Sequence, residues 1–96
     1  MTQAAFPFLT TIPRVEVVAA WTRYQGGAPF PRYEHVSGWA IIHCGHPTAH
    51  CPFYAVDPDG VTHYSETGRP WRKVTECKAE LLERFGVEME VEVTDG

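Results

Sequence analysis

The sequence lacks any long apolar run, and it has few cysteines. Apolar residues make up 44% of its 96 residues, yet no stretch approaches the roughly 20 consecutive apolar residues that a membrane-spanning helix needs. Residues 1–14 have no basic segment ahead of an apolar one and are interrupted by Pro7 and Pro13, which is not the pattern of a secretory signal. Three cysteines, an odd number, argue against a disulfide framework. We therefore expect a soluble, cytoplasmic protein without a membrane partner.

The chain also lacks an excess of positive charge. It carries 8 Lys and Arg residues against 12 Asp and Glu residues, a net charge of −4. Residues 57–96 hold most of the imbalance, with ten acidic side chains and five basic ones. An acidic surface repels phosphate backbones, so direct binding of nucleic acid is disfavoured. The composition instead favours a protein or ribonucleoprotein partner with a basic surface.

Several enzyme motifs are missing as well. The sequence has no glycine-rich phosphate loop, no serine-centred nucleophile elbow and no paired catalytic carboxylates. Its eight prolines and eight glycines indicate short elements joined by many turns. A chain of this length has the size of one domain, and residues 1–96 are treated as a single domain.

The first half of the chain is predicted to form strands. Residues 14–24 are rich in Val and aromatic residues, and residues 37–44 carry apolar side chains on both faces, which is typical of a central strand. Gly-Gly and two prolines predict a loop over residues 25–35. Residues 52–56 and 61–65 flank an Asp-Pro-Asp-Gly turn and predict a β-hairpin.

A helix and a last strand follow. Apolar residues recur at helical spacing from Lys73 to Phe85, and Gly86 is placed to end the helix in the left-handed conformation. Residues 87–93 alternate between apolar residues and Glu, which predicts a half-buried strand with its valines facing inward. The predicted fold is α+β, in the order β-β-β-β-α-β. It is a small, mostly antiparallel sheet of about four to five strands with one helix from the C-terminal half packed on it.

The densest group of chemically active side chains is HCGHPTAHC, residues 43–51. Zinc takes four tetrahedral ligands, usually as two well-separated pairs, and the candidate ligands here are Cys44, His46, His50 and Cys51. Only Pro47, Thr48 and Ala49 separate the two pairs, which is not the spacing of a standard zinc module. The same stretch is typical of a strand end followed by a turn, and we favour that interpretation.

Catalysis by this group is the weaker hypothesis. A thiolate nucleophile at Cys44 or Cys51 needs a base oriented by a third group and an oxyanion hole. The nearest carboxylate, Asp57, already belongs to the predicted hairpin turn. We therefore expect no enzymatic activity and no cofactor, with a small zinc-binding module as the alternative.

Two further stretches are candidate partner-binding surfaces. Glu88, Glu90 and Glu92 form a row of carboxylates on one face of the predicted last strand, roughly 6.6–6.8 Å apart. That row is either a solvated strand face or a mimic of phosphates that occupies a groove meant for nucleic acid. Trp71 and Arg72 precede the predicted helix and either contact an acidic partner or anchor the helix to the sheet.

Two segments carry a resemblance to a known group of proteins. SGWAIIHCGHPTAHCPFYAVDPDG and GRPWRKVTECKAELL resemble segments of small proteins encoded by bacteriophages and prophages. Such proteins include anti-CRISPR inhibitors, which bind a defence nuclease complex and block its nucleic-acid surface. These inhibitors share no motif, so the resemblance assigns no site residue in this chain.

The sequence as a whole predicts a non-enzymatic binding protein. The resemblance implies a phage-encoded inhibitor of a bacterial defence nuclease, acting in the cytoplasm of the bacterial host. Its predicted contact residues are the three glutamates of the acidic row, with Trp71 and Arg72 next. The alternatives are the zinc-binding module and a self-associating phage structural or regulatory component, and a homodimer is compatible with each.

Overall fold

The computed structural model describes residues 14–25 and 29–95. The elements, in chain order, are β1 (Arg14–Ala19), β2 (Trp21–Tyr24), β3 (Arg32–His35), β4 (Ala40–His43), β5 (Phe53–Val56), β6 (Thr62–His63), α2 (Val74–Phe85) and β7 (Glu90–Asp95). Within these residues, no helix combines the length and the apolar character that crossing a bilayer requires.

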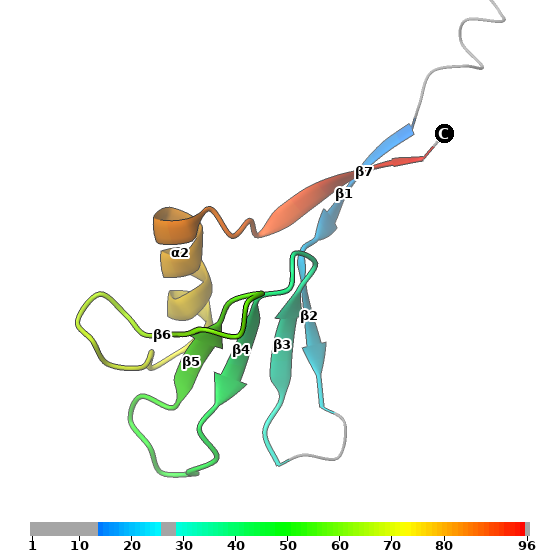
Figure 1. The fold of residues 1–96 in the computed structure, drawn as a ribbon. Helices are drawn as coiled ribbons and strands as arrows, with labels where there is room; N and C mark the ends of the chain where they lie inside the picture. The colour runs from blue at the N-terminus through cyan, green and yellow to red at the C-terminus, as the bar shows by residue number, and fades with distance from the viewer. Residues whose placement is uncertain (1–13, 26–28, 96) are drawn as a thin grey trace, which may run out of the picture.

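The strands form two antiparallel sheets. Five strands pair in the order β2-β3-β4-β5-β6, and β1 pairs with β7 in a two-stranded ribbon. The helix α2 packs against the five-stranded sheet, and the ribbon extends away from it (Figure 1). The predicted α+β class, with one helix on a small antiparallel sheet, is therefore confirmed. The strand β4 lies in the middle of its sheet, as its two apolar faces predicted.

The core lies between α2 and the side of the five-stranded sheet that faces it. Its fully buried residues are Ile41, Ala55, Cys77 and Leu81. Trp71 joins them at the edge of β5. Its backbone N–H donates to the C=O of Phe53 (2.7 Å), and its C=O accepts the N–H of Phe53 (3.1 Å). A segment outside the named strands thus extends the sheet and brings an indole ring into the core.

The helix α2 covers the residues that its spacing predicted. It begins after Lys73, whose backbone is extended, and ends at Gly86, whose φ of 67° is left-handed. The N–H of Val87 then donates to the C=O of Leu81 (3.2 Å), which leaves Val87 only 4% exposed. The glycine therefore reverses the chain so that the next apolar residue returns to the core.

The β5–β6 hairpin closes through Asp57, at the predicted turn. Its C=O accepts the N–H of Gly60 (2.9 Å). Its Oδ1 accepts the N–H groups of Asp59 and Val61, both at 2.9 Å. One carboxylate oxygen therefore satisfies two donors that the tight turn leaves without strand partners.

Three predictions about the strands are wrong in detail. The predicted strand over 14–24 divides at Ala20 into β1 and β2, which belong to different sheets. The predicted loop over 25–35 contains β3, because Tyr33 and His35 both face the core with period two. The predicted strand over 87–93 begins at Glu90 and continues to Asp95.

The buried face of α2 can be tested with neighbouring leucines. Leu81→Ala is expected to lower the free energy of unfolding by about 2–5 kcal/mol, because it leaves a cavity at a fully buried side chain. Leu82→Ala is the matched control at a side chain that is 43% exposed, and it should cost about 1 kcal/mol or less. Urea denaturation followed by circular dichroism measures both. Equal losses would contradict the assignment of the buried face.

Candidate interaction surface

The β1–β7 ribbon joins the five-stranded sheet at Ala20. The N–H of Ala20 donates to the C=O of Met89 (3.0 Å), beside β7, and its C=O accepts the N–H of Val36 (3.0 Å), beside β3. Ala20 is fully buried. A single residue therefore ends the ribbon strand and begins the sheet strand, which is why one continuous apolar pattern forms two strands.

His35 fixes the other strand of the ribbon at this junction. Its Nε2–H donates to the C=O of Glu88 (2.8 Å), because a carbonyl oxygen can only accept. Its Nδ1 therefore accepts, from the N–H (3.0 Å) and the hydroxyl (2.7 Å) of Ser37. The ring is 9% exposed and meets Trp21 edge-on at 4.9 Å. The Nε2–H of His35 thus holds the chain just before β7 against the sheet, and the bonds of Nδ1 to Ser37 fix the orientation of the ring.

Beyond the junction, the ribbon exposes apolar side chains on both of its faces. One face carries the pairs Ala19–Glu90, Val17–Glu92 and Val15–Thr94, and the other carries Val18–Val91 and Glu16–Val93. Val17 is 60% exposed and Val93 is 46% exposed. The prediction that the valines of residues 87–93 face inward is confirmed for Val87, which is 4% exposed, and is wrong for Val93 on β7. In the described part of the chain, the one helix packs on the other sheet and does not cover Val93.

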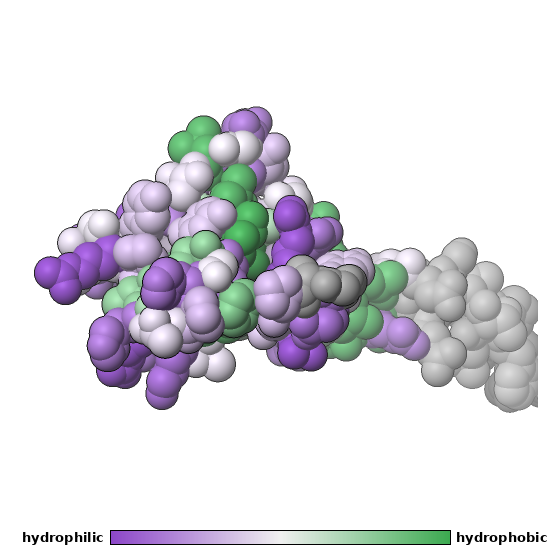
Figure 2. Space-filling view, turned by 90° about the horizontal axis from the view of Figure 1, so that it is seen from below, coloured by the Kyte–Doolittle hydropathy of each residue, from purple (hydrophilic) through white to green (hydrophobic). Residues whose placement is uncertain are grey.

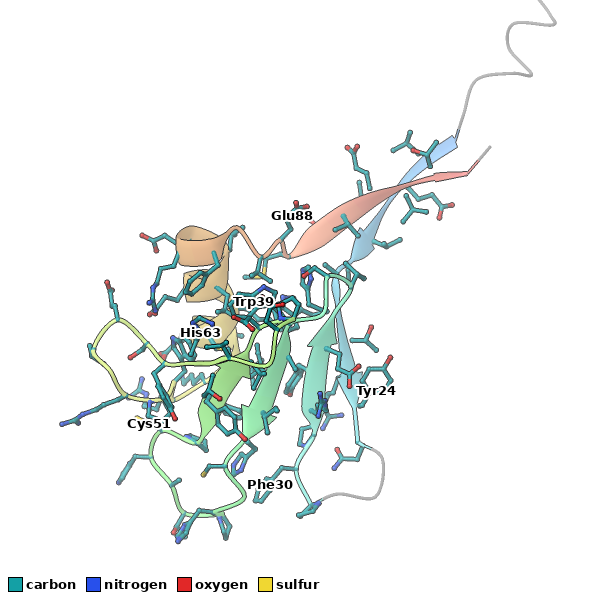
Figure 3. All side chains as sticks on the ribbon, viewed as in Figure 1. Tyr24, Phe30, Trp39, Cys51, His63 and Glu88 are labelled. Atoms are coloured by element: carbon teal, nitrogen blue, oxygen red, sulfur yellow. The ribbon has the colours of Figure 1, made fainter. Side chains whose placement is uncertain are left out.

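The predicted acidic row lies partly on this ribbon. Glu90 and Glu92 share one face of β7, and both are exposed. Glu88 lies in the connection before β7 and is also exposed (Figure 3). Charged and apolar residues therefore alternate over a narrow surface, and Figure 2 shows both kinds side by side along the ribbon. The row consists of two carboxylates on the strand and a third just before it.

Trp71 and Arg72, the second predicted pair, lie in different environments. Trp71 is 4% exposed, so its ring anchors the chain to the sheet and is not presented to a partner in this structure. Arg72 is exposed and lies 3.5 Å from the carboxylate of Glu76, one turn along α2. Exposed pairs of this kind contribute only about 0.3–0.5 kcal/mol. The two residues do not form a joint contact surface.

Residues 44–52 form a loop that is held by its own hydrogen bonds. The N–H of Cys44 donates to the C=O of Pro52 (2.7 Å), and the N–H of Ala49 donates to the C=O of His46 (3.2 Å). The Nδ1 of His46 lies 3.1 Å from the hydroxyl of Thr48. Across the described residues, the structure forms no group of three or more His, Cys, Asp or Glu side chains arranged to hold a metal ion.

His43, at the end of β4, packs as an aromatic side chain. Its ring stacks on Phe30, with centroids 3.6 Å apart, and meets Phe53 edge-on at 5.3 Å. Its Nδ1 accepts the N–H of Gly45 (2.9 Å). Partial burial lowers the pKa of His43 below its ordinary value, because it disfavours the charged ring.

The third cysteine lies in the core. Cys77 is fully buried, and this burial raises the pKa of its thiol to about 12. The thiolate form that a nucleophile requires is therefore almost absent at neutral pH. Cys77 acts as a small apolar side chain between α2 and the sheet.

A His–carboxylate pair connects the β5–β6 hairpin to α2. The Nε2 of His63 lies 2.9 Å from Oδ2 of Asp57, and the imidazole contacts Trp39 and Phe85, each at 5.0 Å between ring centroids (Figure 3). The hydrogen bond from His63, followed by that from the N–H of Val61, lowers the pKa of Asp57. The pair holds the hairpin against the end of the helix.

A hollow of about 360 Å³ lies beside the junction of the ribbon. Its lining includes His35, Trp39, Phe85, Val87, Glu88 and Val91. The ring nitrogens of His35 already make hydrogen bonds, so the hollow offers mainly apolar side chains that continue the surface of the ribbon through Val91.

Comparison of the chain with family models, curated proteins and solved structures gives no match. The function is therefore argued from the chemistry of this surface.

The hydrogen bond between Asp57 and His63 predicts that the stability of the fold depends on pH. Because the pKa of Asp57 is lowered on folding, its stabilisation is complete above the unfolded value of about 3.9 and is lost as the pH falls through the lower folded value. Asp57→Asn carries no charge at any pH. The urea midpoint of the wild type should therefore exceed that of Asp57→Asn at pH 6, and the difference should shrink below about pH 4. A difference that stays constant from pH 6 to pH 3 would contradict the role of the charged carboxylate.

The zinc alternative can be tested directly on the loop. We expect EDTA to leave the thermal midpoint of the untagged protein unchanged, and Cys44→Ser with Cys51→Ser to behave in the same way. A structural zinc ion contributes folding energy outright. A chelator-induced fall of more than about 4–8 °C, equivalent to about 1 kcal/mol for a domain of this size, would support the zinc-binding module.

Proposed function

We propose that this protein is a non-enzymatic binding protein whose β1–β7 ribbon contacts a basic surface of a protein or ribonucleoprotein. The observation that carries the proposal is the ribbon, which extends away from the core (Figure 1). It holds Glu90 and Glu92 on one exposed face, with Val15 and Val17 exposed beside them.

The carboxylates and the valines have different roles in such a contact. Exposed carboxylates steer a basic surface into the correct orientation and each contribute little affinity. The valines lose water when covered, which contributes about 25 cal/mol for each Å² of apolar surface buried. An apolar patch rimmed by charged groups is typical of protein–protein contact sites. The ribbon supplies both components on two short strands.

A narrower form of the proposal is an inhibitor that occupies a nucleic-acid groove. The net charge of −4, the carboxylates on one strand face and the resemblance to phage-encoded inhibitors support this form. In it, Glu90 and Glu92 pair with Arg and Lys side chains that otherwise hold phosphates. The target is then a bacterial defence nuclease complex of the kind that anti-CRISPR proteins block, in the host cytoplasm.

Neutralising the ribbon tests the electrostatic part of the proposal. Glu90→Gln with Glu92→Gln is expected to weaken partner binding about 2- to 30-fold at low salt, because two exposed charges are lost. The fold should be unaffected, because both side chains are exposed. The measurement is capture of the partner from a lysate of the natural host, with native mass spectrometry identifying the complex. Affinity is then titrated at about 50 and about 500 mM salt.

A second double variant provides the matched control. Glu66→Gln with Glu83→Gln removes the same charge from exposed positions outside the ribbon. We expect this control to bind like the wild type, and we expect the difference between the two double variants to shrink at the higher salt concentration. Equal binding by both variants at both salt concentrations would remove the acidic ribbon from the mechanism.

A further inference from the structure

We propose that two copies of this chain associate through the exposed edge of β1, which joins their ribbons into one four-stranded antiparallel sheet. The proposal does not depend on the proposed function, because it uses the edge of the ribbon opposite to β7. Its test needs no other partner, so the two proposals can fail separately.

Among the described strands, only β7 pairs with β1, so the other edge of β1 has no strand partner in this part of the chain. The N–H of Ala20 donates to the C=O of Met89 in the register of the β1–β7 ladder, so the even-numbered residues of β1 direct their backbone groups toward β7. The N–H and C=O groups of Val15, Val17 and Ala19 consequently point away from β7, and all three residues are exposed. A strand edge of this kind is a template for another strand.

The same edge is bordered by exposed apolar side chains. Val15 and Val17 are 55% and 60% exposed, and Val36, whose N–H donates to the C=O of Ala20 at the base of this edge, is 66% exposed. An isolated two-stranded ribbon is only marginally stable in water, whereas additional strands stabilise it. A third strand on this edge therefore supplies backbone partners and covers part of the valine surface.

Symmetry and charge favour the β1 edge of a second copy as the occupant. A two-fold axis at Val17 sets this residue against its own copy and sets Val15 against Ala19, so that the outward-pointing backbone groups meet. The same register sets Glu16 against Val18. No two like charges face each other in this arrangement, because β1 holds one cation, Arg14, and one carboxylate.

The β7 edge does not fit a second copy in this way. Its sequence has three carboxylates, Glu90, Glu92 and Asp95, and no cation. Pairing two β7 edges brings these carboxylates from both copies onto neighbouring strands, where like charges destabilise the pairing. Pairing β1 of one copy with β7 of the next is head-to-tail and does not close into a dimer. The β1 edges therefore meet at the centre, and the acidic β7 edges stay on the outside.

Sedimentation equilibrium of the full chain tests the proposal. The wild type should change from monomer to dimer between about 1 and 300 µM, as expected for an interface smaller than the standard size. Val17→Pro removes an N–H that points away from β7 and should weaken the dimer about 5- to 100-fold, because two hydrogen bonds are lost at the axis. Thr94→Pro makes the same kind of change at an outward-pointing position of the β7 edge, and it should dimerise like the wild type.

A charge swap at the axis tests the register separately, in case proline disturbs the ribbon. Val17→Lys and Val17→Glu should each dimerise more weakly than the wild type, because identical charges meet at the axis, and an equimolar mixture should form the mixed dimer. The proposal is overturned by a wild type that stays monomeric, or by Val17→Pro dimerising like the wild type. It is equally overturned if the mixture associates no better than its components, or if Thr94→Pro loses the dimer as Val17→Pro does.

Discussion

The structure depends on the residue at which one strand changes partners. In a regular strand the N–H and C=O of a residue point the same way, so both serve one neighbour. At Ala20 they serve two: the N–H bonds to Met89 beside β7, and the C=O bonds to Val36 beside β3. The backbone must therefore twist there from one sheet into the other. His35 holds the opposite strand by its bond to the C=O of Glu88, and together these bonds direct the ribbon away from the core.

The single described helix, α2, covers an apolar face of the five-stranded sheet and leaves the ribbon uncovered. Its 12 residues pack on the five-stranded sheet, and Cys77 and Leu81 are the helix side chains that enter the core. The ribbon extends away from this helix (Figure 1), so Val15, Val17 and Val93 remain exposed. The surface that we propose for partner binding is therefore a strand ribbon that no other described element covers, rather than a cleft.

This division also explains which features the sequence could predict. The helix over 74–85, its glycine end and the turn at Asp57 depend on residues a few positions apart, and all three were predicted. The split at Ala20 depends on hydrogen bonds to Val36 and Met89, which lie 16 and 69 positions away. A local sequence pattern cannot predict partners at that distance. The alternation in 87–93 predicted an apolar face but not what covers it. In 43–51 the residue types allowed a zinc site, but their spacing already favoured a strand end and a turn, and the structure has a loop held by its own hydrogen bonds there.

The two edges of the ribbon differ in a way that composition alone does not require. Strands exposed at a sheet edge usually carry charges that prevent unwanted pairing, and β7 follows this rule with Glu90 and Glu92 at positions whose backbone groups point outward. At the corresponding positions β1 carries Val15, Val17 and Ala19 instead. An exposed strand edge without charges can pair with strands of other chains, which risks aggregation unless the edge has a partner of its own. The asymmetry is explained if the β1 edge is covered in the working protein while the acidic β7 edge stays open, which assigns one edge to assembly and the other to recognition.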